Sequence, residues 1–149
     1  MSLQQKVMED MKAAMRAKDA VALEALRAIK SAILLAQTES SSKDLSEKDE
    51  LKILQKLVKQ RRDSAQIFTE QNRADLAEPE LNQAKIIEKF LPEQLSEEEI
   101  TAIVKQVISA TGAASMSDMG KVMGAANAKI AGRADGKTIS TIVKRELSS

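Results

Sequence analysis

Neither cysteine nor histidine occurs in the 149 residues of the sequence. Without these side chains the chain has no disulfide, no thiolate nucleophile, no imidazole base and none of the usual ligand sets for zinc. The Ser-His-Asp and Cys-His catalytic arrangements are therefore excluded, and acid–base chemistry would rest on carboxylates or lysines alone. We predict no catalytic residue, no metal site and no cofactor.

Aromatic side chains are nearly absent, since Phe68 and Phe90 are the only two. Stacking of bases on an aromatic platform, a usual way of binding single-stranded RNA, is therefore not available. An excess of charge of one sign is absent too, because 23 basic and 22 acidic residues leave a net charge of +1. No global field demands a polyanionic partner, although local basic patches can still attract one.

Long hydrophobic runs are also missing, because the longest apolar stretches are a few residues and far short of a membrane span. Residues 1–6 contain no charged segment that leads into an apolar run, which is the pattern of a signal peptide. We therefore expect no association with a membrane and a cytoplasmic location.

Helical periodicity is what the sequence does contain. All five glycines lie at or beyond Gly112, the two prolines are Pro79 and Pro92, and nothing has the alternation of a strand. The expected helices cover about 3–17, a segment capped by Asp19, a long segment that begins at Ser46, a segment from near Pro79 to Phe90, Ser96–Gly112, Ser117–Gly132 and a last segment from near Asp135. The predicted fold class is all-α.

The same spacing predicts which apolar residues face inward and how the chain divides. Met15, Leu34 and Leu81 fall on the apolar stripes of the first, second and fourth predicted helices. The polar run over 38–44 predicts a loop. We expect a long-helix bundle over residues 1–94 and a small three-helix domain over 95–149, joined at 91–94.

A stripe of basic residues lies on the third predicted helix. Winding this segment at about 100° per residue gathers Lys52, Lys56, Lys59 and Arg62 on a side away from the apolar residues. Such a stripe can follow a phosphate backbone. The alternative is a solvated face that is partly neutralised by Asp63 and by carboxylates on neighbouring helices.

Arg61 falls inside the apolar stripe of the same helix. A guanidinium there must be paired, or must reach past the edge of the core with its stem buried. We expect a buried ion pair with Glu78, Glu80 or Glu88 on the following helix. The alternative is an arginine positioned for the phosphate or carboxylate of a ligand.

A second basic segment runs from Gly120 to Lys137. Gly120 and Gly124 lie one turn apart within a predicted helix, where each costs roughly 1 kcal/mol relative to alanine. Tight packing of helices in the small domain would compensate for this cost, and so would the close approach of a partner's backbone. The candidate contacts to a nucleic acid are Gly120, Gly124, Lys121, Lys129, Arg133 and Lys137.

Residues 132–138 look like a phosphate-binding loop, but three residues instead of four separate the two glycines and no strand precedes them. The sequence predicts a turn there instead, in which Asp135 or Gly136 caps the last helix.

Several short motifs point to a known family when they are taken together. They are KQRRDS at 59–64, RADLA at 73–77 followed by Glu80, Ile86-Ile87, FLPEQLS at 90–96, MGKVMG at 119–124, GRADGK at 132–137 and Val143-Lys144. In this combination the chain resembles the YqeY-like family over almost its whole length. The family shares its domain with the C-terminal tail of the B subunit of the glutamyl- and aspartyl-tRNA amidotransferase.

The resemblance implies an all-helical fold in two parts and kinship with a tail that helps to hold tRNA. Stand-alone relatives are often described by this kinship as carbon–nitrogen ligases with glutamine as amido-N-donor, although the chemistry sits in other domains and subunits of the amidotransferase. The resemblance implies that the role of the tail in contacting tRNA carries over to residues 120–137 of this chain.

Three functions follow from these observations as hypotheses. The first is a tRNA-associated binding module, which is related to tRNA-dependent amidation and grips the RNA backbone through the basic C-terminal segment. The second is an adaptor that docks on an aminoacyl-tRNA synthetase or an amidotransferase through a helix groove. The third is an autonomous amide-transferring enzyme, which would lack the cysteine of the usual thioester glutaminase.

Overall fold

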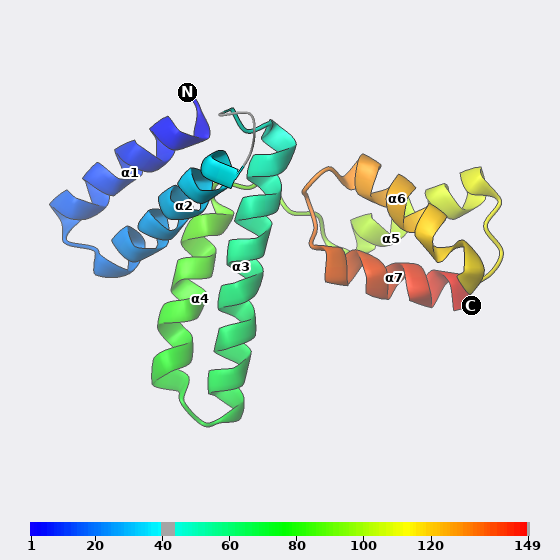
Figure 1. Ribbon diagram of the computed structural model, residues 1–149. Helices are drawn as coiled ribbons and strands as arrows, with labels where there is room; N and C mark the ends of the chain where they lie inside the picture. Colours follow the sequence, from blue (N-terminus) through cyan, green and yellow to red (C-terminus); the bar gives the residue numbers. More distant parts are fainter. Residues whose placement is uncertain (40–43, 149) are drawn as a thin grey trace. The chain divides into compact units, whose positions relative to one another are not determined.

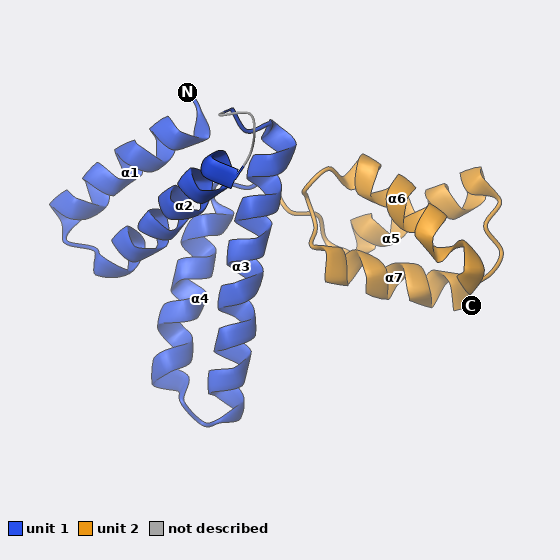
Figure 2. Cartoon of the chain, viewed as in Figure 1, with its two compact units in different colours: residues 1–91 blue, residues 92–149 orange. Residues whose placement is uncertain are grey.

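The computed structural model describes residues 1–39 and 44–148. Over these ranges the chain forms seven α-helices and one short 3-10 helix, and it contains no strand (Figure 1). The predicted all-α class is confirmed. The chain separates into two compact units, unit 1 (Met1–Leu91) and unit 2 (Pro92–Ser149) (Figure 2).

Unit 1 consists of two antiparallel helix pairs. These are α1 (Leu3–Ala17) with α2 (Ala20–Glu39) and α3 (Glu47–Glu70) with α4 (Ala74–Glu88). Nε2 of Gln4 donates to Oε1 of Gln37 at 3.4 Å, so the start of α1 lies beside the end of α2. α2 packs against both α3 and α4. Its contacts bury one core, made of Val7, Ala14, Ala25, Leu26, Ile29, Ile33, Leu54, Val58, Ala84 and Ile87.

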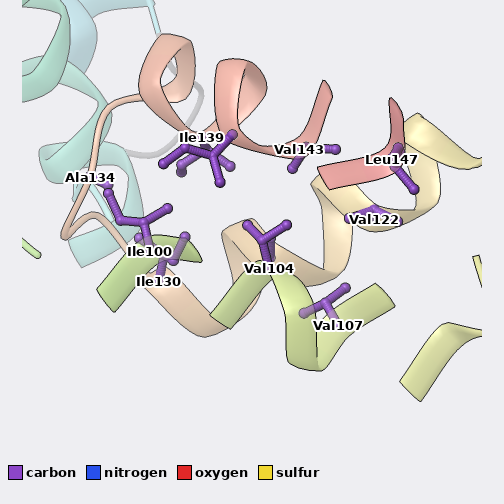
Figure 3. Packing of buried hydrophobic residues seen from close by; sticks show 11 residues of the cluster. Ile100, Val104, Val107, Val122, Ile130, Ala134, Ile139, Val143 and Leu147 are labelled. Atoms are coloured by element: carbon purple, nitrogen blue, oxygen red, sulfur yellow. The ribbon is translucent and has the colours of Figure 1, made fainter. Parts of the chain in front are cut away.

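Unit 2 is a three-helix bundle of α5 (Glu97–Thr111), α6 (Met119–Ile130) and α7 (Gly136–Ser148), with the 3-10 helix Met116–Asp118 before α6. Each of the three helices packs against the other two. Isoleucines and valines from all three meet in the centre (Figure 3). The buried residues are Ile100, Val104, Val107, Val122, Ala126, Ile130, Ala134, Ile139, Ile142, Val143 and Leu147.

Local capping decides where most helices begin. The Ser46 hydroxyl accepts from the backbone N–H of Asp49, and the Asp49 carboxylate accepts from Ser46 in return. The hydrogen bond from the Ser46 side chain, and to a smaller extent the bond from its backbone, lowers the pKa of the Asp49 carboxyl below its ordinary value of 3.8. Ser96 begins α5 through the same capping box, and Gly112 ends it in the left-handed conformation at φ 69°. The predicted boundaries at Ser46, Ser96 and Gly112 are confirmed.

The predicted start of the fourth helix near Pro79 is wrong, because α4 begins at Ala74. Pro79 lies in the second turn of α4, where its missing N–H leaves only the carbonyl of Asp75 without an intrahelical bond. Burial of Ala77, which is 4% exposed, stabilises the first turn in the α3–α4 hairpin. The tertiary contact therefore outweighs the local cost of the proline.

Three apolar residues that the periodicity places inward are exposed: Met15 by 60%, Leu34 by 49% and Leu81 by 41%. α1 packs on a single neighbouring helix, so it buries a narrower stripe than the spacing predicts. Leu81 precedes Ala84 and Ile87, which are the α4 residues that enter the core shared with α2. Each prediction assumed a neighbouring element on a side of the helix where the described residues of unit 1 provide none.

The loop predicted over 38–44 begins later than expected. α2 continues through Thr38 and Glu39, and the Thr38 hydroxyl donates to the carbonyl of Leu35 at 2.8 Å. Residues 40–43 of the predicted loop lie outside the described residues.

Candidate nucleic-acid interface

Gly120 and Gly124 lie on the open side of α6. Val122, Ala126 and Ile130 recur every four residues on the core side of this helix and are fully buried. Each glycine precedes a core residue by two positions, which places it about 200° around the helix from the core. A Cβ added at either glycine would meet no atom within 4 Å outside its own helix backbone. The interpretation that these glycines allow a close helix crossing within the small domain is therefore wrong.

Small side chains continue this open side of α6. Asn127, Ala128 and Ala131 follow the glycines and are exposed. Lys121 follows Gly120 directly and is exposed. The result is a helix face of glycines and small side chains beside one exposed lysine.

The predicted lysine contacts all reach solvent. Lys121, Lys129 and Lys137 are exposed, and none forms an ion pair within the described part of the chain. Lys144 is a further exposed lysine without such a pair, two turns after Lys137 on the same face of α7. The sequence prediction missed Lys144, although its spacing of seven residues from Lys137 indicates that both lysines lie on one face of the helix.

Arg133 has a structural role that the sequence did not indicate. Its Nε donates to the carbonyl of Ile130 at 2.9 Å and its Nη2 to the carbonyl of Lys129 at 2.8 Å. These are carbonyls of the last turn of α6, which have no partner within the helix. The Arg133 carbonyl in turn accepts from the Leu95 N–H at 2.8 Å. The side chain thus closes α6 and lies only partly exposed.

The segment from Gly132 to Thr138 is the predicted turn. Ala131 and Gly132 adopt positive φ angles of 49° and 83° and reverse the chain after α6. The Asp135 carboxylate then accepts from the backbone N–H of Thr138 at 2.7 Å at the start of α7. Of the two predicted caps, Asp135 and Gly136, it is Asp135 that caps the last helix, and Gly136 is the first residue of α7.

The basic stripe of α3 is partly neutralised. Nζ of Lys59 lies 2.6 Å from a carboxylate oxygen of Asp63, and Arg62 pairs with Glu88 of α4. Lys52 and Lys56 are exposed, and within the described residues neither forms an ion pair. Two of the four charges are therefore compensated, as the solvated-face interpretation requires.

Arg61 has no carboxylate partner among the described residues, so the predicted ion pair is wrong. Its Nε donates to Oε1 of Gln83 at 3.1 Å and its Nη1 to the carbonyl of Leu57 at 3.2 Å. Glu88, one of the expected partners, bonds to Arg62 instead. Nothing in the sequence distinguished the amide of Gln83 from the three nearby glutamates.

Comparison with known proteins then identifies the family. Residues 4–147 match the family described as Yqey-like protein. The chain belongs to the YqeY-like family. The predicted resemblance is confirmed over nearly the whole chain, and both units lie within the match.

Three relatives give this membership its context. The chain is 38% identical over 104 residues to the Kluyveromyces lactis protein "Altered inheritance of mitochondria protein 41, mitochondrial", covering 68% of this chain and 56% of that protein. Its counterpart in Lachancea thermotolerans is 35% identical over 103 residues, covering 68% and 55%. One glutamyl-tRNA(Gln) amidotransferase subunit of Thermococcus gammatolerans is 42% identical over 73 residues, covering 46% of this chain and 12% of that protein. The chain thus spans little more than half of the two yeast relatives.

The structure also bears on the expectation about membranes. Within the described residues, no helix combines the length and the apolar character that crossing a bilayer requires. The two yeast relatives have names that include the word mitochondrial. The cytoplasmic location stays a prediction.

Proposed function

We propose that unit 2 is a tRNA-binding module that grips the RNA backbone over the open side of α6. The observation that carries the proposal is the glycine pair Gly120 and Gly124, beside the exposed Lys121. Two helical glycines cost roughly 1 kcal/mol each, and no packing inside unit 2 compensates for them. A partner backbone that approaches this surface closely would supply the compensation.

The lysines give the proposed site its chemistry. Lys121, Lys129 and Lys137 would pair with phosphates and release the counterions condensed on the RNA. Since aromatic platforms are missing, recognition would rest on the shape and backbone of a folded tRNA. The similarity to a subunit of a glutamyl-tRNA(Gln) amidotransferase supports tRNA as the nucleic acid.

The proposal assigns no chemical step to this chain. The carbon–nitrogen ligase activity associated with the family's kinship would belong to a larger assembly in which this chain binds tRNA. An aminoacyl-tRNA synthetase or an amidotransferase would then be the partner that acts on the bound tRNA.

The test is the binding of fluorescently labelled tRNA, followed by anisotropy over a series of salt concentrations. We expect affinity that falls steeply with salt and exceeds that for an RNA duplex of equal length. Because the chain has no tryptophan or tyrosine, RNA carried through purification would dominate the ultraviolet spectrum and is easily detected. Absence of binding at low salt would overturn the proposal.

Matched lysine variants locate the site. Lys121→Ala and Lys137→Ala should each weaken binding and reduce the salt slope by about one per lost phosphate contact. Lys105→Ala removes the same charge from the exposed surface of α5 and is the control. An equal effect of all three variants would show attraction to net charge instead of a site on α6 and α7.

The adaptor remains the second candidate because α1 exposes apolar residues at a regular spacing. Met8 and Met15 are 43% and 60% exposed and lie seven residues apart on one side of α1, and Met1, which precedes the helix, is 66% exposed. Methionine-rich faces adapt readily to partner helices. A protein partner retained after nuclease treatment, together with no tRNA binding, would favour this function.

A further inference from the structure

One face of the α3–α4 hairpin is covered by α2 over only part of its length. The hydrogen bond from Nε of Arg61 to Oε1 of Gln83, at 3.1 Å, shows where the two helices lie opposite each other. Seven residues make about two helical turns, so steps of seven from this pair stay on one face. Away from the turn of the hairpin, the step reaches Leu54 and Phe90, which lie in or against the core that α2 completes. The covered part of the face is therefore the part far from the turn.

Phe68 and Leu76 lie on the same face near the turn, seven residues closer to it than Arg61 and Gln83. Phe68 is half-buried, Leu76 is 38% exposed, and neither belongs to the core of unit 1. This end of the hairpin extends beyond α1 and α2 (Figure 1). Aromatic side chains are enriched where proteins bind one another, and here one of only two in the sequence lies outside the core.

The end of the hairpin is formed without help from α2. Ala65 of α3 and Ala77 of α4 are 3% and 4% exposed, although neither belongs to the core shared with α2. The α3–α4 contact buries these small side chains instead. At the start of α4, Arg73 donates two hydrogen bonds of 3.1 Å to the carboxylate of Asp75. A partner therefore meets a preformed surface, which lowers the cost of ordering it on binding.

The charge at this end of the hairpin is acidic. Residues 64–82 contain four acidic residues and one basic residue, Arg73, which is paired with Asp75. The other three acidic residues form no ion pair with any described residue, and they are Glu70, Glu78 and Glu80. Glu80 lies one turn from Leu76 on the same face. Such a surface repels phosphate groups and attracts cationic side chains.

We infer that this end of the hairpin docks a basic amphipathic helix of a partner protein. The apolar side of that helix packs on Phe68 and Leu76, where the cover provided by α2 has ended. Its lysines or arginines pair with Glu80 and the neighbouring glutamates, which select a cationic segment over a neutral or acidic one. The surface belongs to unit 1 alone, so it goes beyond the tRNA site proposed in unit 2 and does not depend on it.

The probe for this surface is a fluorescently labelled synthetic peptide of leucine and lysine, about five helical turns long, with the leucines on one helical face. It is titrated with the full chain and followed by anisotropy. We expect saturable binding that weakens with salt. A peptide of the same composition in scrambled order, and one with glutamate in place of lysine, should each bind at least about tenfold more weakly. Equal binding of all three peptides, or no binding, would overturn the proposal.

Matched leucine variants locate the site. Leu76 and Leu81 are 38% and 41% exposed on the same helix, and their spacing places them about 140° apart around it. Leu76→Ala should weaken binding of the amphipathic peptide about fivefold or more, whereas Leu81→Ala should leave it unchanged. Equal losses in the two variants, or no loss in Leu76→Ala, would overturn the site.

Two further measurements separate the docking surface from folding and from RNA. Glu80→Gln should weaken peptide binding and reduce its dependence on salt, which a merely structural role of Glu80 would not do. An unchanged salt dependence would overturn the pairing with Glu80. Leu76→Ala should bind tRNA as the wild type does, and a loss of tRNA affinity in this variant would overturn the assignment to a protein partner. Since the peptide and tRNA are measured separately, failure of one proposal leaves the other testable.

Discussion

The guanidinium of Arg133 donates to the carbonyl of Lys129 at 2.8 Å, so the arginine closes the helix that it follows. The sequence places the same side chain in a phosphate-binding set. Since Nε also bonds to the Ile130 carbonyl, two donors of Arg133 are already used inside unit 2. In the proposed tRNA-binding module, the role of Arg133 is therefore to hold the turn between α6 and α7, which Lys129 and Lys137 flank.

We predict that Arg133→Ala destabilises unit 2 by about 1–3 kcal/mol, because two charge-assisted hydrogen bonds to carbonyls in the last turn of α6 are lost. Urea unfolding followed by circular dichroism measures this, since the chain has no tryptophan for fluorescence. Lys121→Ala is the control and should change stability by no more than about 0.5 kcal/mol. Equal stabilities of the two variants would show that the arginine cap contributes nothing.

Replacing the open glycines should separate stability from binding. Gly120→Ala and Gly124→Ala add a Cβ into free space on a helix, so each should stabilise the protein by about 0.4–1 kcal/mol. Both should weaken tRNA binding, because the methyl groups block close approach. Unfolding curves and anisotropy on the same samples provide the measurement. Stabilised variants that bind tRNA as well as the wild type would remove the glycine side from the site.

Stability should fall in acid through the Ser46–Asp49 capping box. Hydrogen bonds from Ser46 lower the pKa of Asp49 below its ordinary value of 3.8. A lowered folded-state pKa contributes stability above the ordinary value, and this contribution is lost as the pH falls through the folded-state pKa. Asp49→Asn should therefore flatten the pH dependence of the melting temperature below about pH 5. An unchanged acid profile would contradict the role of this carboxylate.

Neighbouring residues on α2 should differ sharply in their effect on stability. Ile33 is 2% exposed and Leu34 is 49% exposed. Ile33→Ala should cost about 2–5 kcal/mol, as for other buried large-to-small changes, whereas Leu34→Ala should cost about 0.5 kcal/mol or less. Chemical denaturation of both variants checks the difference. A large loss for Leu34→Ala would mean that its side chain is covered by a partner in solution.

Sequence patterns predicted the helices well because their signals are local. Ser46 and Ser96 begin helices through hydrogen bonds to residues three positions further along the chain. Gly112 ends a helix through its own left-handed backbone conformation. The start of α4 was missed because burial of Ala77 stabilises the first turn of the helix and outweighs the cost of Pro79. The orientations of Leu34 and Leu81 were missed because periodicity shows which side of a helix is apolar, but not how much of it a neighbour covers.

The candidate site divides in the same way. The sequence alone indicated the glycine pair, the lysines and the position of Arg61 within an apolar stripe. These features depend only on residue types and on their spacing along the chain. Only the tertiary structure decided that the glycines face outward, that Arg133 caps α6, and that Arg61 meets Gln83 instead of a glutamate. These outcomes depend on which side chains lie within a few ångströms across the chain, and long-range packing sets those distances.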